Sequence, residues 1–190
     1  YRSQETVDAL SFNVDIEQYK TGPIRLFYGA EFVGNKVGSR GAIQQLSSET
    51  TSPYASRYPD NSSWTTVAAY LNGSLETGKA LSFLGGLRYS HVWIDAAFDP
   101  SFFNFPFDKA QLSTGAFTGS LGLSWFAAED LQVSWNATTG FRAPNIDDIG
   151  KVFDSEPGSV VVPNPNLQPE YAYGTEVGLK KNFKDKLVLK

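Results

Sequence analysis

The stretch LQVSWNATTGF, residues Leu131–Phe141, decides how the rest of the chain is interpreted. Its large apolar side chains fall on alternate positions, and polar or glycine residues stand between them. A period of two residues is the period of a β-strand whose two faces lie in different surroundings, and no helical spacing fits it. The stretch therefore predicts a long strand with one apolar face.

The same alternation recurs along most of the chain. It predicts strands over residues 7–20, 24–38, 64–76, 80–95, 114–126, 130–141, 171–182 and 186–190. Most of these are about 11 to 16 residues long, whereas strands of globular proteins usually have about five or six. A tilted strand needs about 9 to 11 residues to cross the hydrocarbon of a membrane. The lengths therefore favour strands that span a membrane.

The connections between the predicted strands alternate between short and long. Tight turns are expected at 21–23, 77–79, 127–129 and 183–185, and long loops at 39–63, 96–113 and 142–170. Tight turns at one end and long loops at the other are typical of outer-membrane barrels. We predict an all-β fold, an antiparallel meander of about eight long strands that is a segment of a transmembrane β-barrel. Alternation alone fits a soluble β-sandwich equally well.

Composition excludes several classes of function. The net charge is -4 and we find no basic patch, so nucleic acid is not an expected partner. The chain has no cysteine, which excludes disulfides, thiol nucleophiles and cysteine-based metal sites. No apolar run is long enough for a transmembrane helix. Because no catalytic motif occurs, we predict no enzyme activity, no catalytic residue, no metal site and no cofactor.

Several other residues attract attention. Tyrosines and tryptophans near strand ends are candidates for the aromatic girdles of a barrel, although strands favour aromatic residues in any case: Tyr19, Trp64, Tyr89, Trp93, Trp125 and Tyr171. The single histidine, His91, is expected to line the lumen or the rim. The cluster Phe98–Phe107 could contact an apolar or planar ligand, or pack the loops together. Arg40 and Arg57 could meet an anionic ligand or remain solvated.

The segment after Phe141 breaks the strand pattern. Pro144 cannot donate a ladder hydrogen bond and disfavours regular pairing of Ala143, so it predicts the end of a strand. Residues 145–149 could form one short helical turn. Pro163, Pro165 and Pro169 keep the return segment extended, and Glu170 then opens the next strand. We interpret this as a stiff crossing at a barrel mouth.

Two parts of this segment resemble a known pair of motifs. GFRAPN (140–145) and PNPNLQPEYAYGTEVGLK (163–180) are similar to the FRAP and NPNL boxes of TonB-dependent outer-membrane receptors. RYPDNSSWTTVAAYLNGSLE (57–76) and LGGLRYS (84–90) resemble the same family, so the similarity covers essentially the whole chain. In that family the boxes bracket an extracellular loop. The resemblance implies a site made of Phe141, Arg142, Ala143, Pro144, Asn145, Asn164, Pro165, Asn166, Leu167, Pro169 and Glu170, which shape and gate the loop.

The resemblance also implies a function. It implies energised uptake of a ferric siderophore, haem, cobalamin or a glycan in the bacterial outer membrane, with lipid, a nutrient ligand and the TonB complex as partners. Such barrels have about 22 strands and a plug. Residues 1–190 are therefore expected to form a partial barrel without plug or closing strand. No histidine lies between Arg142 and Asn164, which departs from haem receptors. A passive porin or adhesin barrel and a soluble carbohydrate-binding sandwich remain the alternatives.

Overall fold

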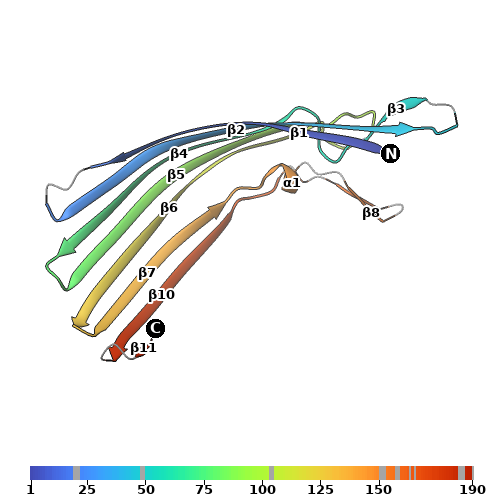
Figure 1. Cartoon of the computed structure of the whole chain (residues 1–190). Helices are drawn as coiled ribbons and strands as arrows, with labels where there is room; N and C mark the ends of the chain where they lie inside the picture. Colours follow the sequence, from blue (N-terminus) through green and yellow to red (C-terminus); the bar gives the residue numbers. More distant parts are fainter. Residues whose placement is uncertain are drawn as a thin grey trace.

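A computed structural model describes residues 1–18, 22–47, 50–102, 105–149, 153–156, 159–162, 164, 166–183 and 187–189. Within these residues, long antiparallel strands form one curved sheet in the order β1-β2-β4-β5-β6-β7-β10-β11 (Figure 1). Their bounds are β1 Arg2–Glu17, β2 Ile24–Gln44, β4 Ser62–Thr77, β5 Leu81–Ala97, β6 Lys109–Ala128, β7 Leu131–Arg142, β10 Glu170–Phe183 and β11 Leu187–Leu189. The predicted antiparallel meander is confirmed.

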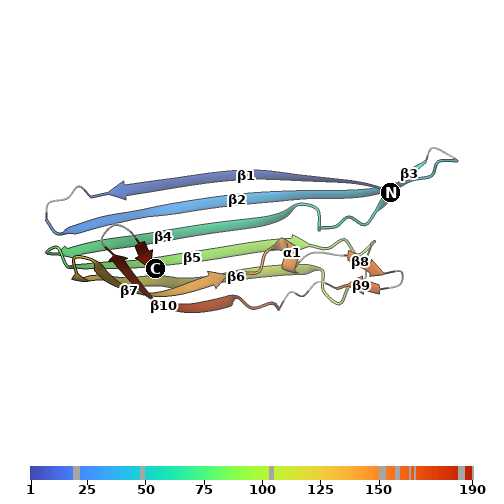
Figure 2. The same ribbon diagram turned by 60° about the horizontal axis from the view of Figure 1, so that its bottom comes forward.

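The two ends of the sheet differ as the loop lengths predict. The connections from β4 to β5 and from β6 to β7 lie at one end, and α1 (Ile146–Ile149) lies at the other (Figure 2). At that second end β3 (Thr51–Tyr54) pairs with the last residues of β2. The β7–β10 loop also holds a small hairpin of β8 (Phe153–Glu156) and β9 (Ser159–Val161). We refer to this end as the loop end.

Several strands run further into the loop end than predicted. β1 begins at Arg2 rather than residue 7, β2 reaches Gln44 rather than residue 38, and β6 begins at Lys109 rather than residue 114. Main-chain pairing continues there, for example between Arg2 and Ala42. The residues are polar on both faces, so alternation vanishes while the ladder does not. For the same reason the short strands β3, β8 and β9 left no pattern in the sequence.

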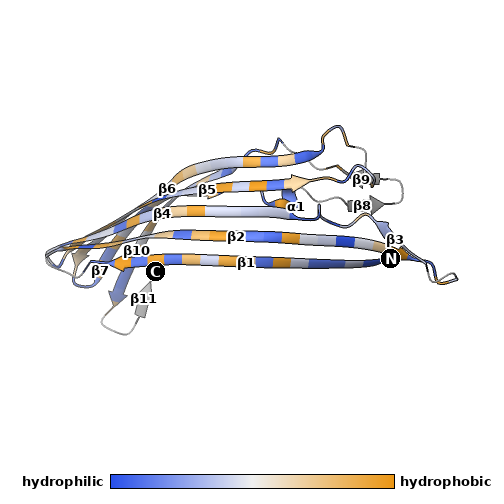
Figure 3. Cartoon of the chain, turned by 90° about the horizontal axis from the view of Figure 1, so that it is seen from above, coloured by the Kyte–Doolittle hydropathy of each residue, from blue (hydrophilic) through white to orange (hydrophobic). Residues whose placement is uncertain are grey.

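One face of the sheet carries an exposed apolar surface. Residues paired across neighbouring strands share a face, and one such row runs across the sheet through Ile24, Leu75, Phe83, Leu123, Trp135 and Val177. Four of these side chains are large exposed hydrophobics, with Val177 73% exposed. Figure 3 shows apolar and polar residues alternating along the strands. A single layer with such a face needs an apolar environment around it.

The apolar character of this outer face ends toward the loop end. Another row on the same face passes through Asp8, Lys36, Ser63, Asp95 and Gln111, and every member is polar. The side chains of Gln111 and Asp95 are hydrogen bonded to each other. The strands therefore continue beyond the apolar surface.

The opposite face is polar in the middle of the sheet. Tyr70 donates a hydrogen bond to Asp15, and Arg88 forms an ion pair with Glu31. The guanidinium of Arg88 also lies over the Tyr70 ring, 5.6 Å from its centroid. This face continues into Val92, which packs with α1 on the concave side of the sheet (Figure 1). A hydrated interior suits such charges.

The aromatic residues singled out near the strand ends divide between the two faces. Tyr89, Trp93, Trp125 and Tyr171 share the outer face, as expected of a girdle. Trp64 does not, because it pairs with Asn35 and Ile94, and Ile94 packs on the concave side. The expectation for Trp64 was therefore wrong, since only the register fixes its face. Tyr19 lies outside the described residues.

His91 lies on the outer face and does not line the lumen. It pairs with Val67 and Gly115, its ring contacts Trp93 at 4.2 Å between centroids, and its nitrogens are hydrogen bonded to Tyr89 Oη and Ser113 Oγ, both at 3.1 Å. In the described residues no helix is long and apolar enough to cross a membrane.

Candidate functional site: the packed loop end

The two motif segments meet where β7 ends and β10 begins. Arg142 and Glu170 are register partners in the ladder. One guanidinium nitrogen of Arg142 lies 3.3 Å from Glu170 Oε1, and the other lies 2.7 Å from Asp148 Oδ2 in α1. A planar guanidinium is suited to hold two carboxylates in fixed directions. Arg142 therefore joins both motif segments to the helix between them.

The helix α1 begins with a reciprocal cap. The side chain of Asn145 accepts a hydrogen bond from the Asp148 N–H at 2.9 Å, and Asp148 Oδ2 accepts one from the Asn145 N–H at 3.0 Å. This arrangement satisfies otherwise unpaired amide groups at a helix start. Pro144, directly before the cap, is buried. The predicted helical turn is confirmed, and Pro144 ends the ladder as expected.

The second motif segment contributes a turn and an apolar anchor. Asn164 Oδ1 accepts a hydrogen bond from the Asn166 N–H at 3.0 Å, which is the geometry of an Asx turn. Leu167 packs against buried residues of the loop end. Pro169 is half-buried. Pro163 and Pro165 lie outside the described residues.

An apolar cluster, here called the loop core, joins the long loops. Its buried members are Val92, Ile94, Ala96, Phe98, Ala110, Ile146 and Ile149. Partly buried residues pack around it: Val37, Tyr58, Phe105, Phe107, Leu112, Phe141, Ala143 and Leu167. These side chains come from strands β2, β5, β6 and β7 and from all three long loops. The motif residues Phe141, Ala143 and Leu167 thus act by packing.

The first long loop is tied to α1 by polar contacts. Tyr58 Oη donates a hydrogen bond to Asp147 Oδ1 at 2.6 Å, and Arg57 Nη2 lies 3.5 Å from the same oxygen. Burial and the hydrogen bond to Asp147 raise the pKa of Tyr58 to about 12. The phenol therefore remains a donor at neutral pH. Arg57 is paired with a carboxylate rather than available to an anionic ligand.

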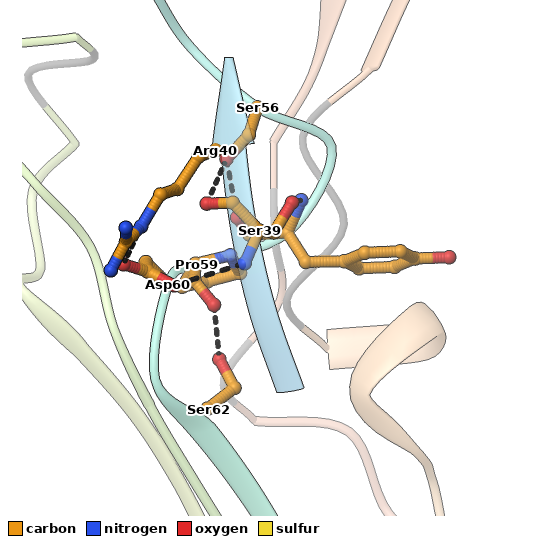
Figure 4. Close-up of polar contacts among 7 residues, drawn as sticks. Ser39, Arg40, Ser56, Pro59, Asp60 and Ser62 are labelled. Atoms are coloured by element: carbon orange, nitrogen blue, oxygen red, sulfur yellow. Dashed lines mark hydrogen bonds and ion pairs between the residues drawn. The ribbon is translucent and has the colours of Figure 1, made fainter. Parts of the chain in front are cut away.

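A second polar network fixes the same loop against β2 (Figure 4). Asp60 accepts a hydrogen bond from the Ser39 N–H at 2.9 Å and lies 3.3 Å from Arg40 Nε. These bonds, led by that from Ser39, hold the pKa of Asp60 below its usual value. Ser56 Oγ lies within hydrogen-bond distance of the carbonyl oxygens of Ser39 and Tyr58, at 3.0 and 2.8 Å.

This network was not predicted from the sequence. Arg40 was singled out, but its partner was not. The only local signal is the Pro-Asp-Asn turn, in which Asn61 adopts a positive φ of 59°. Asn61 places Asp60 toward β2, and Ser62 Oγ closes the turn on the Pro59 carbonyl at 2.7 Å (Figure 4).

A cleft of about 520 Å³ opens between the β2–β3 hairpin and the β5–β6 loop. We call it the loop cleft. One wall consists of Gly41, Ala42, Pro53, Tyr54 and Ala55, and the other of Ala97, Phe98, Phe102 and Phe105. The polar network of Ser39, Arg40 and Asp60 lies at its base. In the described residues, no group of three or more His, Cys, Asp or Glu side chains could hold a metal ion.

Comparison with known proteins places this arrangement in context. The sequence model of the family described as "TonB dependent receptor-like, beta-barrel" matches residues 1–189. No curated protein sequence matches the chain.

Solved structures share the fold at low sequence identity. The "Copper transporter OprC" superposes with a TM-score of 0.78 at 14% identity, over 96% of this chain and 28% of that one. The hemophore receptor HasR of Serratia marcescens, in complex with its hemophore HasA and heme, gives 0.73 at 17% identity, over 97% and 31%. The ferric yersiniabactin uptake receptor FyuA of Yersinia pestis gives 0.61 at 14% identity, over 96% and 27%. The chain spans less than a third of each of these proteins.

Proposed function

Because this chain belongs to the TonB-dependent receptor β-barrel family, we propose that it is part of an outer-membrane receptor for energised nutrient uptake. The family is one of transport receptors, and the proposal includes no catalytic step. The nutrient is bound at the loop end and passes through a plugged barrel under the control of the TonB complex. Ferric siderophores, haem, cobalamin and glycans are the candidate ligand classes.

The observation that carries this proposal is the packed loop end. Loops of a pore without ligand specificity have no need for a shared apolar core, whereas a receptor needs a rigid surface to recognise one ligand. Here Ile146 and Ile149 of one loop are buried against Phe98 of another, and a cleft of small-molecule size lies beside them. The exposed apolar outer face supports insertion in a membrane and opposes the soluble sandwich.

Residues 1–190 are proposed to form part of the barrel wall, with the plug and further strands elsewhere in the complete receptor. The motif residues are proposed to position the loop rather than react. Arg142 clamps Asp148 and Glu170, Asn145 caps α1, and Leu167 anchors the return segment. Ligand binding that rigidifies or moves this loop would then be transmitted directly to β7 and β10.

Uptake by cells tests the proposal. A strain that lacks the full-length receptor is supplied with each candidate nutrient in labelled form, with and without the wild-type gene. We expect the gene to restore uptake of one nutrient class, and we expect that uptake to stop when the TonB complex is removed. Gene-dependent uptake that continues without the TonB complex would contradict the proposal and indicate a passive pore.

A further inference from the structure

The loop cleft has aromatic rings on both walls. Tyr54 on the hairpin side is 44% exposed, and Phe102 on the opposite side is 39% exposed. Exposed rings at a cleft offer large apolar contact area with little side-chain entropy to lose. The cleft therefore has the surface of a binding site for a ring.

The walls behind these rings are held in place. Phe98 packs edge-on against Phe105 at 5.7 Å and against Phe107 at 5.6 Å between ring centroids, and Phe105 stacks on Phe107 at 5.5 Å. On the other wall, a Cβ at Gly41 would lie 2.6 Å from the carbonyl oxygens of Tyr54 and Ala55. Only glycine permits this close approach of the hairpin to β2. Both walls are thus formed before any ligand arrives.

The charges around the cleft are already compensated. Arg40, the cation among the lining residues, is paired with Asp60. Asp99 accepts hydrogen bonds from the Ser101 N–H and hydroxyl at 2.9 and 2.6 Å, and these bonds hold its pKa below the usual value. A strongly anionic ligand would lose its hydration here without gaining an uncompensated positive charge. The described lining therefore favours a ligand of low net charge.

We infer that the loop cleft binds an aromatic ring of a metal chelate with low net charge. The cleft volume of about 520 Å³ suits a small molecule. The inference rests on the proposed receptor function and narrows its ligand to an aryl-bearing chelate. The phenylalanine-rich loop then has both roles considered from the sequence, because Phe98, Phe105 and Phe107 pack the loops and Phe102 contacts the ligand.

Binding to the full-length receptor tests the inference without transport. Cells that produce the receptor are chilled and exposed to three radioiron chelates. One is a low-charge ferric complex of a hydroxyphenyl-oxazoline chelator, one a low-charge ferric trihydroxamate without rings, and one a highly anionic ferric tris-catecholate. We expect the first to bind at least tenfold more tightly than the other two. Phe102→Leu and Tyr54→Leu should each weaken its binding by about three- to tenfold.

The matched control is Phe117→Leu, which changes a phenylalanine that is 67% exposed on the outer face and should leave binding unchanged. Equal or tighter binding of the hydroxamate or the catecholate would overturn the inference. So would failure of all three chelates to bind, or binding unaffected by both cleft variants. Energy-dependent uptake without preference for the aryl chelate would refute only the inference, whereas energy-independent uptake would refute the receptor function.

Discussion

Replacing Ile149 by alanine should release the loop helix without disturbing the sheet. Ile149 is 2% exposed and belongs to the loop core, so its whole side chain is removed from water. The substitution deletes three carbon atoms at about 0.8 kcal/mol each, which gives about 2.4 kcal/mol. The cavity left behind adds to this, and measured Ile→Ala changes in protein cores cost about 2 to 5 kcal/mol.

This energy concerns docking of the loop, because β7 and β10 are paired independently of α1. A loss of about 2.4 kcal/mol increases the open population about fiftyfold. Hydrogen–deuterium exchange on the full-length receptor should therefore show about fiftyfold faster exchange at the amides of Asp148 and Ile149. Both amides donate to Asn145 in the closed loop. Amides in β5 and β6 should keep their protection.

Leu46→Ala is the control, because Leu46 lies in a loop at the same end and is 94% exposed. It should leave exchange in α1 unchanged. The reasoning would be refuted if Ile149→Ala left the exchange of α1 at its original rate, or if amides throughout β5 and β6 exchanged faster as well. The first result would mean that the loop core does not hold the loop, and the second that it holds the barrel.

Other predictions follow from single contacts. Arg142→Gln should speed exchange in α1 and slow uptake, while Arg142→Lys should keep only one of the two carboxylate contacts and give an intermediate result. Because the pKa of Tyr58 is raised from 10.0 to about 12, its bond to Asp147 stabilises loop docking fully below pH 10 and is lost as the pH rises through 12; exchange-independent proteolysis of the loop should rise over that window, and Tyr58→Phe should abolish the pH dependence. Gly41→Ala should abolish binding at the loop cleft because a Cβ would meet backbone oxygens at 2.6 Å, whereas Gly85→Ala, whose nearest contact is 3.7 Å away, should bind normally; a titration of purified receptor compares them.

The sequence predicted those parts of the fold that depend on local contrast. In Leu131–Phe141 and Tyr171–Asn182 each residue faces either an apolar or a polar environment, so the strands are visible as alternation. Arg2–Thr6 lacks that contrast because both of its faces are polar, so the beginning of β1 was not visible. Pro144 and Asn145 predicted the helical turn because capping is a local interaction.

The site itself was only partly predictable, because its contacts are distant in the sequence. Tyr58 and Asp147 are 89 positions apart, and no local pattern connects them. The face of Trp64 was misjudged for the same reason, since the strand register decides it. The residues of the two boxes were found by resemblance, and their roles in recognition remain proposals. What the structure adds is their placement around the loop core.

The extension of β2 beyond the apolar outer face affects what meets the receptor first at the cell surface. From Lys36 to Gln44 the strand continues, paired with β1 and β3, for roughly 25 Å along its axis at about 3.3 Å per residue. In a receptor placed as proposed, this stalk raises the hairpin and the exposed Leu46 above the lipid. Antibodies and bacteriophages would reach this hairpin tip without entering the cleft. The tip is thus free to vary under immune or phage pressure while the walls of the cleft are constrained by the ligand.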